Sequence, residues 1–118
     1  MNNRTIELAV FKELQDTAGA DFVVELVDTF LADAPPMLKS MHEALGAGDA
    51  DGFRRAAHSL KSNGHTFGAM ALGALARELE QGGLDGARKR HASGESALDA
   101  LDAEYARVAA ALTQLRNA

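Results

Sequence analysis

The feature of the sequence that most restricts its fold is an apolar seam near the C-terminus, between residues 98 and 115. Large apolar side chains recur there in alternating steps of three and four residues, the spacing that places them on one side of an α-helix. They are Leu98, Leu101, Tyr105, Val108, Leu112 and Leu115. A helix with such a side must be covered by a partner helix.

The composition also favours helices. Apolar residues make up 47% of the 118 residues, but alanine and leucine supply most of them, and the aromatic residues are five Phe and one Tyr. The sequence contains no cysteine, which excludes disulfides, thiolate metal sites and cysteine nucleophiles. A chain of this length is expected to form one domain, here residues 1–118.

Apolar periodicity and glycine positions predict the other helices. We expect a short helix over residues 6–14, a second from Asp21 to near Gly46 that Pro35-Pro36 kinks or divides, a third from Asp49 or Asp51 to Gly68, and a fourth over residues 69–81. The glycine-rich stretch 82–94 is expected to be a loop, with room for one helical turn. The predicted fold is all-α: an antiparallel four-helix bundle with a short N-terminal lid helix.

Charge and hydropathy narrow the function classes. The formal net charge of −5 argues against nucleic acid as a partner. The first nine residues form no signal peptide, and no segment approaches the roughly 18 apolar residues of a membrane span. The chain starts with methionine and shows no linker at either end, so we expect a free-standing, monomeric, cytoplasmic protein.

The third helix presents two histidines away from its apolar face. On an ideal helix, a buried stripe lies within roughly 60° of Phe53, whereas His58 and His65 point about 120–140° away from it. The stripe consists of Phe53, Ala56, Ala57, Leu60, Gly64 and Phe67. Both imidazoles are therefore predicted to face solvent.

The surroundings of His58 suit phosphoryl transfer. This chemistry requires a neutral imidazole nitrogen, open approach for in-line attack and a cation near the phosphoryl oxygens. An exposed imidazole is mostly neutral at about pH 7.5, and Lys61 stands three residues further on. Between Phe53 and Gly68 there are two Arg, one Lys and no acidic residue, so the helix should attract anions or an acidic partner. We predict His58 to be a phosphoryl acceptor supported by Lys61.

These residues resemble the signature of histidine-containing phosphotransfer (HPt) domains. The matching run is Ala57-His58-Ser59-Leu60-Lys61-Ser62-Asn63-Gly64, with Gly68 ten positions after the histidine. The resemblance extends from Ile6 to Leu115 and implies a four-helix bundle that docks receiver domains. It also implies that His58 is phosphorylated and that Lys61 supports the phosphoryl group. Ser62 departs from the family, which usually has glycine after the lysine, and this change can alter docking.

The resemblance further implies a place in a phosphorelay. The expected partner is the receiver domain of a response regulator or of a hybrid histidine kinase. From their exposed positions we expect Arg54, Arg55, Ser62 and His65 to take part in docking, with solvated surface charge as the alternative for the two arginines. The chain lacks the glycine-rich segments of a kinase, so we expect a carrier without its own ATP site. It also lacks clustered carboxylates, so we expect no cofactor of its own and Mg²⁺ on the partner receiver domain.

Other interpretations remain. His65 is a rival phosphoryl acceptor, but Gly68 stands where a supporting lysine would be. His42 and His91 have no defined partner residue in the sequence, and we assign no chemistry to them. A helical module that binds a receiver or kinase without accepting phosphate is a second function class. A metal-binding bundle is a third, but His58 and His65 lie about 10 Å apart along the helix, and no metal ligand is predicted.

Overall fold

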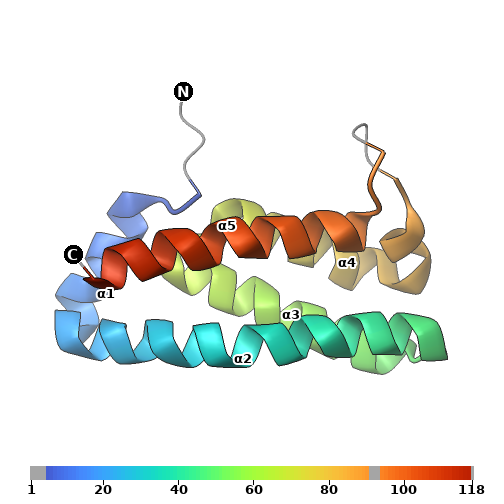
Figure 1. Ribbon diagram of the computed structural model, residues 1–118, viewed down its shortest axis with the longest axis horizontal. Helices are drawn as coiled ribbons and strands as arrows, with labels where there is room; N and C mark the ends of the chain where they lie inside the picture. Colours follow the sequence, from blue (N-terminus) through green and yellow to red (C-terminus); the bar gives the residue numbers. More distant parts are fainter. Residues whose placement is uncertain (1–4, 91–93, 118) are drawn as a thin grey trace.

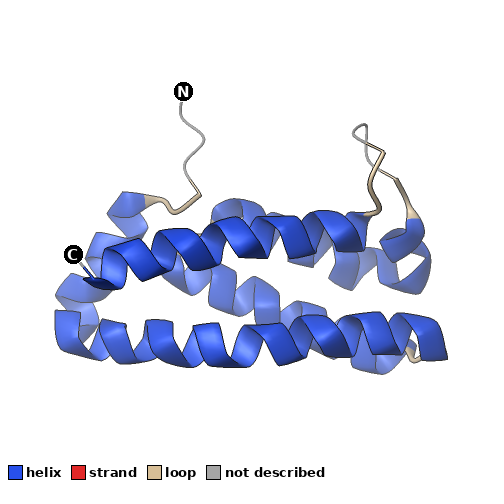
Figure 2. Cartoon of the chain, in the orientation of Figure 1, coloured by secondary structure: helices blue, strands red, loops and turns tan. Residues whose placement is uncertain are grey.

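The computed structural model describes residues 5–90 and 94–117, and it arranges these residues in five helices (Figures 1 and 2). The helices are α1 (Leu8–Ala18), α2 (Ala20–Ala47), α3 (Ala50–Phe67), α4 (Met70–Arg88) and α5 (Ala97–Asn117). Extended pairing within the described ranges is limited to one isolated bridge between Arg90 and Ser96. The prediction of an all-α fold is confirmed.

Helices α2 to α5 form the bundle. Each packs against its neighbour in the chain, and α5 returns to pack against α2, which closes the bundle. In Figure 1, α2 and α5 lie in front, and α3 and α4 lie behind them. The short α1 crosses one end and contacts α2 and α3. This is the predicted bundle with a lid helix.

The core of the bundle is built from one face of each helix. The predicted seam of α5 supplies four fully buried side chains, Leu98, Leu101, Val108 and Leu112. Tyr105 and Leu115, at the edges of the seam, are partly buried and pack against the core. Partial burial raises the pKa of Tyr105, whose ring meets Phe30 edge-on at 5.8 Å between centroids. No described helix is both long and apolar enough to cross a membrane.

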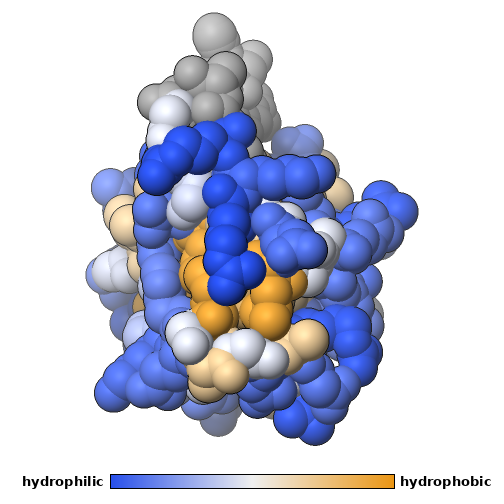
Figure 3. Space-filling view, turned by 90° about the vertical axis from the view of Figure 1, so that its right-hand side faces the viewer, coloured by the Kyte–Doolittle hydropathy of each residue, from blue (hydrophilic) through white to orange (hydrophobic). Residues whose placement is uncertain are grey.

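Apolar side chains reach the surface at the end of the bundle opposite α1 (Figure 3). Figure 3 looks onto the end where α2 stops and α3 starts, and apolar side chains are visible there within a frame of polar ones. The lid helix thus covers one end of the core only.

The two prolines of α2 do not break the helix. Pro35 and Pro36 lie inside a continuous helix that runs to Ala47, so of the two expected arrangements the structure has the single helix and not two abutting ones. Both prolines are exposed, so water can reach the carbonyl groups that lose their helical donors. The buried Ala34 and Leu38 keep one apolar face continuous past the prolines, and this packing favours an unbroken helix.

The observed start of α3 agrees with the sequence prediction, whereas the observed start of α2 does not. Asp49 caps α3, because its carboxylate accepts a hydrogen bond from the Gly52 backbone N–H at 3.0 Å. Asp21 was the expected cap of α2 but lies in its first turn, and Gly19 occupies the cap position without a side-chain hydrogen bond. There, the carboxylate of Asp21 still interacts favourably with the positive end of the helix.

The fourth helix extends beyond its predicted end. Gly83 has a non-helical backbone (φ 65°, ψ −154°), which ends the first regular part about where expected. A further helical segment then runs to Arg88, so most of the predicted loop before residue 89 is helical. The buried Ala87 explains the difference, since it attaches this segment to the core.

Helices α3 and α4 pack closely because two glycines face each other. A Cβ atom on Gly64 would lie 3.2 Å from the backbone nitrogen of Gly73 and 3.3 Å from the carbonyl oxygen of Ala69. These distances leave little room for any side chain, so the two backbones approach closely where they leave the turn at Gly68.

Gly68 also anchors the lid. Its φ of 82° is in the left-handed region, and its carbonyl accepts a hydrogen bond from the Glu7 backbone N–H at 2.8 Å. A Cβ atom here would lie 2.8 Å from the carbonyl oxygen of Glu7 and 3.0 Å from Cβ of Val10. The turn between α3 and α4 therefore requires glycine for both its conformation and its contact with the lid.

We predict that Gly68→Ala lowers the free energy of unfolding by about 2–4 kcal/mol, because strain and a clash with the lid act together. Gly48→Ala is the matched control: Gly48 is also left-handed (φ 73°), but a Cβ atom there meets nothing within 4 Å. The control should cost roughly 1 kcal/mol. Urea unfolding of both variants measures the difference, and equal losses would contradict the clash.

Candidate functional site

His58 lies near the middle of α3 on its outer face. Its side chain is 58% exposed, while Ala57 and Leu60 on either side of it are fully buried. The wheel prediction that the imidazole faces solvent is confirmed. Helical packing thus fixes the backbone beneath an open ring.

A carboxylate from α4 lies against this histidine. Oε2 of Glu80 is 2.8 Å from Nδ1 of His58, and Oε1 of Glu80 is 2.8 Å from Nζ of Lys61. The Glu80 side chain is only 19% exposed, so its position is well defined by its surroundings. One carboxylate therefore holds both residues that the sequence singled out.

The hydrogen bonds determine the charge of this carboxylate. The bond from Lys61 and then that from His58 lower the pKa of Glu80, and they outweigh partial desolvation, which acts in the opposite direction. Glu80 is therefore ionised near neutral pH and can only accept hydrogen bonds.

The negative charge of Glu80 determines which ring nitrogen of the neutral His58 imidazole carries the proton. Since the carboxylate only accepts, Nδ1 of His58 must carry the proton that it donates. The lone pair of the ring is then on Nε2, the other ring nitrogen. The site thus offers an unprotonated nitrogen on an exposed imidazole, with the ammonium group of Lys61 on the same carboxylate.

Glu80 is a member of the site that the sequence alone did not reveal. It lies on a different helix from His58, 22 residues away in the chain. The one available signal was its position next to Leu79, an apolar residue that is buried in the structure, which places Glu80 at the edge of the packed face. Which residue of α3 it meets depends on how α3 and α4 cross.

The positive charge of α3 is largely paired. Arg54 forms an ion pair with Asp51, one turn earlier, and Arg55 lies 3.4 Å from the same carboxylate. Lys61 is paired with Glu80 and 25% exposed. The net charge of +3 counted along α3 therefore overstates its attraction for anions, because Asp51 and Glu80 lie outside the counted stretch.

The other two predicted docking residues are exposed on α3. Ser62 points outward one turn from His58. His65 is exposed but lies over α4, because its Nε2 would be 2.5 Å from a Cβ atom on Gly73. The absence of a side chain on Gly73 thus makes room for the imidazole of His65.

The two remaining histidines differ from each other. His42 does have a companion, so the expectation that it had none is wrong: its Nε2 is 2.6 Å from Oδ2 of Asp102 in α5. His91 lies outside the residues that the structure describes.

Comparisons with known proteins identify the family to which the chain is similar. The family model for the Hpt domain matches residues 25–118. Among solved structures, the chain is similar to the crystal structure of histidine-containing phosphotransfer protein B (HptB) from Pseudomonas aeruginosa PAO1. The two share 31% sequence identity and a TM-score of 0.83, over 98% of this chain and 97% of that chain. No curated protein matches the sequence.

We predict that Glu80 controls the tautomer of His58. In the wild type at about pH 8, two-bond ¹H–¹⁵N spectra of the imidazole should show a majority of the form protonated on Nδ1. In Glu80→Ala this majority should be lost, because no carboxylate accepts the proton. Glu43→Ala, an exposed glutamate of α2, is the control and should leave the spectrum unchanged. An unaltered tautomer in Glu80→Ala would contradict the assignment.

Proposed function

Because the chain belongs to the Hpt domain family and is a histidine phosphotransfer protein of phosphorelays, we propose that His58 is the residue that carries the phosphoryl group. The observation that carries this proposal is the carboxylate of Glu80 on Nδ1 of an exposed histidine. This contact leaves Nε2 free to act as a nucleophile.

The transfer follows from this geometry. The lone pair of Nε2 attacks the phosphorus of an aspartyl phosphate on a receiver domain, the nitrogen–phosphorus bond forms, and the bond from phosphorus to the aspartate oxygen breaks. The ring gains positive charge as the bond forms, and the adjacent Glu80 carboxylate stabilises it. The reverse reaction passes the group to a receiver aspartate. In this proposal Glu80 is a positioning residue, and any Mg²⁺ belongs to the partner.

Lys61 supplies the cation. Its Nζ now contacts Oε1 of Glu80, close to the ring that receives the phosphoryl group. A dianionic phosphoryl group on His58 would compete with Glu80 for this ammonium, and the flexible lysine chain allows Nζ to turn towards it. Phosphorylation therefore exchanges one anionic partner of Lys61 for another.

The receiver domain docks on the exposed side of α3 in this proposal. Arg54, Arg55, Ser62 and His65 are all exposed on the helix that carries His58, which supports their assignment to docking. The side chain of Ser62 adds bulk one turn from His58, so it affects which receiver domains can dock. We further propose a monomeric, cytoplasmic, single-domain carrier, residues 1–118, that has no ATP site and depends on a kinase for its phosphoryl groups.

The alternative within the same family is a decoy that binds receiver domains without accepting phosphate. The two functions differ in one chemical event, the formation of a phosphorus–nitrogen bond at His58. Binding alone does not separate them.

We predict that the chain becomes labelled when it is incubated with a receiver domain, its kinase and labelled ATP. The label should be acid-labile and base-stable, as expected for a phosphorus–nitrogen bond. It should be lost in His58→Gln and kept in His65→Gln, the matched control on the same helix. Binding without label would favour the decoy, and loss of label only in His65→Gln would move the acceptor to that residue.

For Lys61→Gln we predict slower transfer, on the order of tenfold, with His58 still labelled in the end. The ammonium group should stabilise the transition state more than it affects folding, because Lys61 is partly exposed. The control is Lys39→Gln, an exposed lysine of α2. Rapid-quench measurements of phosphoryl transfer compare the rates, and a rate equal to that of the wild type would exclude the proposed role.

A further inference from the structure

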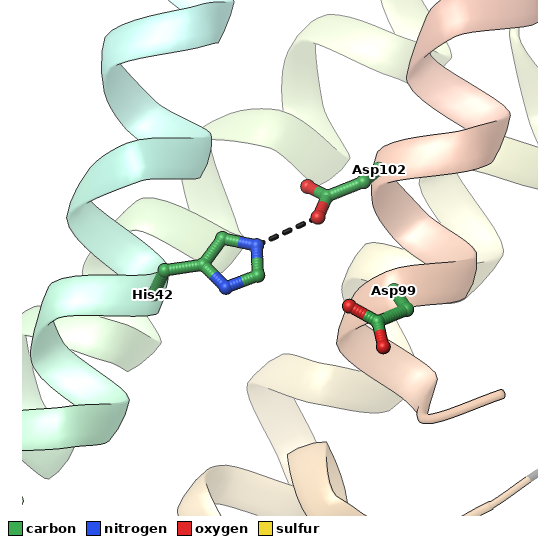
Figure 4. A group of neighbouring side chains, drawn as sticks. All are labelled: His42, Asp99 and Asp102. Carbon is green, nitrogen blue, oxygen red and sulfur yellow. Dashed lines mark hydrogen bonds and ion pairs between the residues drawn. The ribbon is translucent and has the colours of Figure 1, made fainter.

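Three side chains with metal-binding groups converge on the side of the bundle formed by α2 and α5. They are His42 from α2 and Asp99 and Asp102 from α5, and one ligand atom of each lies within 4.8 Å of the other two. Figure 4 shows the imidazole of His42 reaching across to α5, with both aspartates on the same side of that helix. In the described ranges 5–90 and 94–117, no other group of this kind is found.

The helices themselves bring the three residues together. Asp99 and Asp102 are three residues apart in α5, a spacing that places both carboxylates on one side of the helix. Nε2 of His42 lies 2.6 Å from Oδ2 of Asp102, so the ring is already turned towards the carboxylates. His42 and Asp99 are exposed and Asp102 is partly buried, so an ion can enter from solvent.

The donor set is one imidazole nitrogen and two carboxylate oxygens. Zn²⁺ binds both kinds of ligand at about 2.0–2.2 Å, which places tetrahedral ligand atoms about 3.4 Å apart. The three ligand atoms lie within 4.8 Å of one another, at most about 1.4 Å more than this value, and rotation of the side chains can provide the difference. Two carboxylates also match the charge of a divalent ion, whereas Mg²⁺ and Ca²⁺ prefer sites made of oxygen alone.

We propose that His42, Asp99 and Asp102 form a surface site for a divalent transition metal ion of the Zn²⁺ type. His42 binds the ion through Nε2, each aspartate contributes one oxygen, and water occupies the fourth position. The hydrogen bond between His42 and Asp102 is replaced when the ion enters, and Nδ1 carries the remaining ring proton. This proposal departs from the sequence analysis, which expected neither clustered carboxylates nor a metal ligand.

The site is separate from the phosphoryl acceptor. His58 and Glu80 belong to α3 and α4, which lie behind α2 and α5 in Figure 1. An ion at His42 therefore leaves the proposed docking face of α3 open. Because His42 and Asp102 are 60 residues apart in the chain, the site exists only in the folded protein, and binding should stabilise the bundle.

The test is titration of the metal-free protein with Zn²⁺ alone, followed by calorimetry and thermal unfolding. We expect one ion per chain with micromolar affinity and a rise in Tm of several degrees that a chelator reverses. His42→Ala and Asp99→Asn should each weaken binding by roughly tenfold or more. Both residues are exposed, so the variants should keep the circular dichroism spectrum of the wild type.

Two control variants exclude the other histidine sites. His58→Gln and His65→Gln should bind Zn²⁺ as the wild type does, because neither residue belongs to the group. No saturable binding to the wild type would overturn the proposal. So would binding that survives both His42→Ala and Asp99→Asn, or binding that His58→Gln abolishes.

Discussion

The close packing of α3 against α4 is the constraint on which the candidate site depends. Gly64 allows this approach, since a Cβ atom there would lie 3.2 Å from the backbone nitrogen of Gly73 in the second helix, and Gly73 leaves room for the side chain of His65. The tight approach brings the outer edge of α4 within reach of the exposed side of α3. Glu80 can then contact two residues of α3 through a single short side chain.

Glu80 is central to the site because its single carboxylate contacts both His58 and Lys61. It orders the imidazole of His58 and also holds Lys61, the cation that we propose to support the phosphoryl group. Before transfer, the site is therefore electrostatically satisfied, which stabilises the resting protein. In the proposed transfer, the phosphoryl group on His58 adds negative charge next to Glu80, and the two anions then compete for Lys61.

The two sides of the bundle have different properties. The α3 side presents two exposed histidines, His58 and His65, and the charged groups around His58 are paired within the protein. The α2 and α5 side presents His42 and two aspartates that link helices far apart in the sequence. Since the helices pack as a closed bundle, a change of charge or bound ion on the second side can alter stability without contact with His58.

The sequence by itself determined which stretches are helical and which side of each is buried, because apolar periodicity is a local property. It identified the seam of α5, the start of α3 at Asp49 or Asp51 and the outward orientation of His58 in this way. It left open whether α2 is divided at Pro35, where packing against other helices favours one helix, and it was wrong about the cap of α2, which is Gly19 and not Asp21. Only the tertiary structure decided that Glu80 faces His58 and that Asp102 faces His42. Both contacts depend on how two helices cross. The spacing of residues within a single helix carries no information about that crossing.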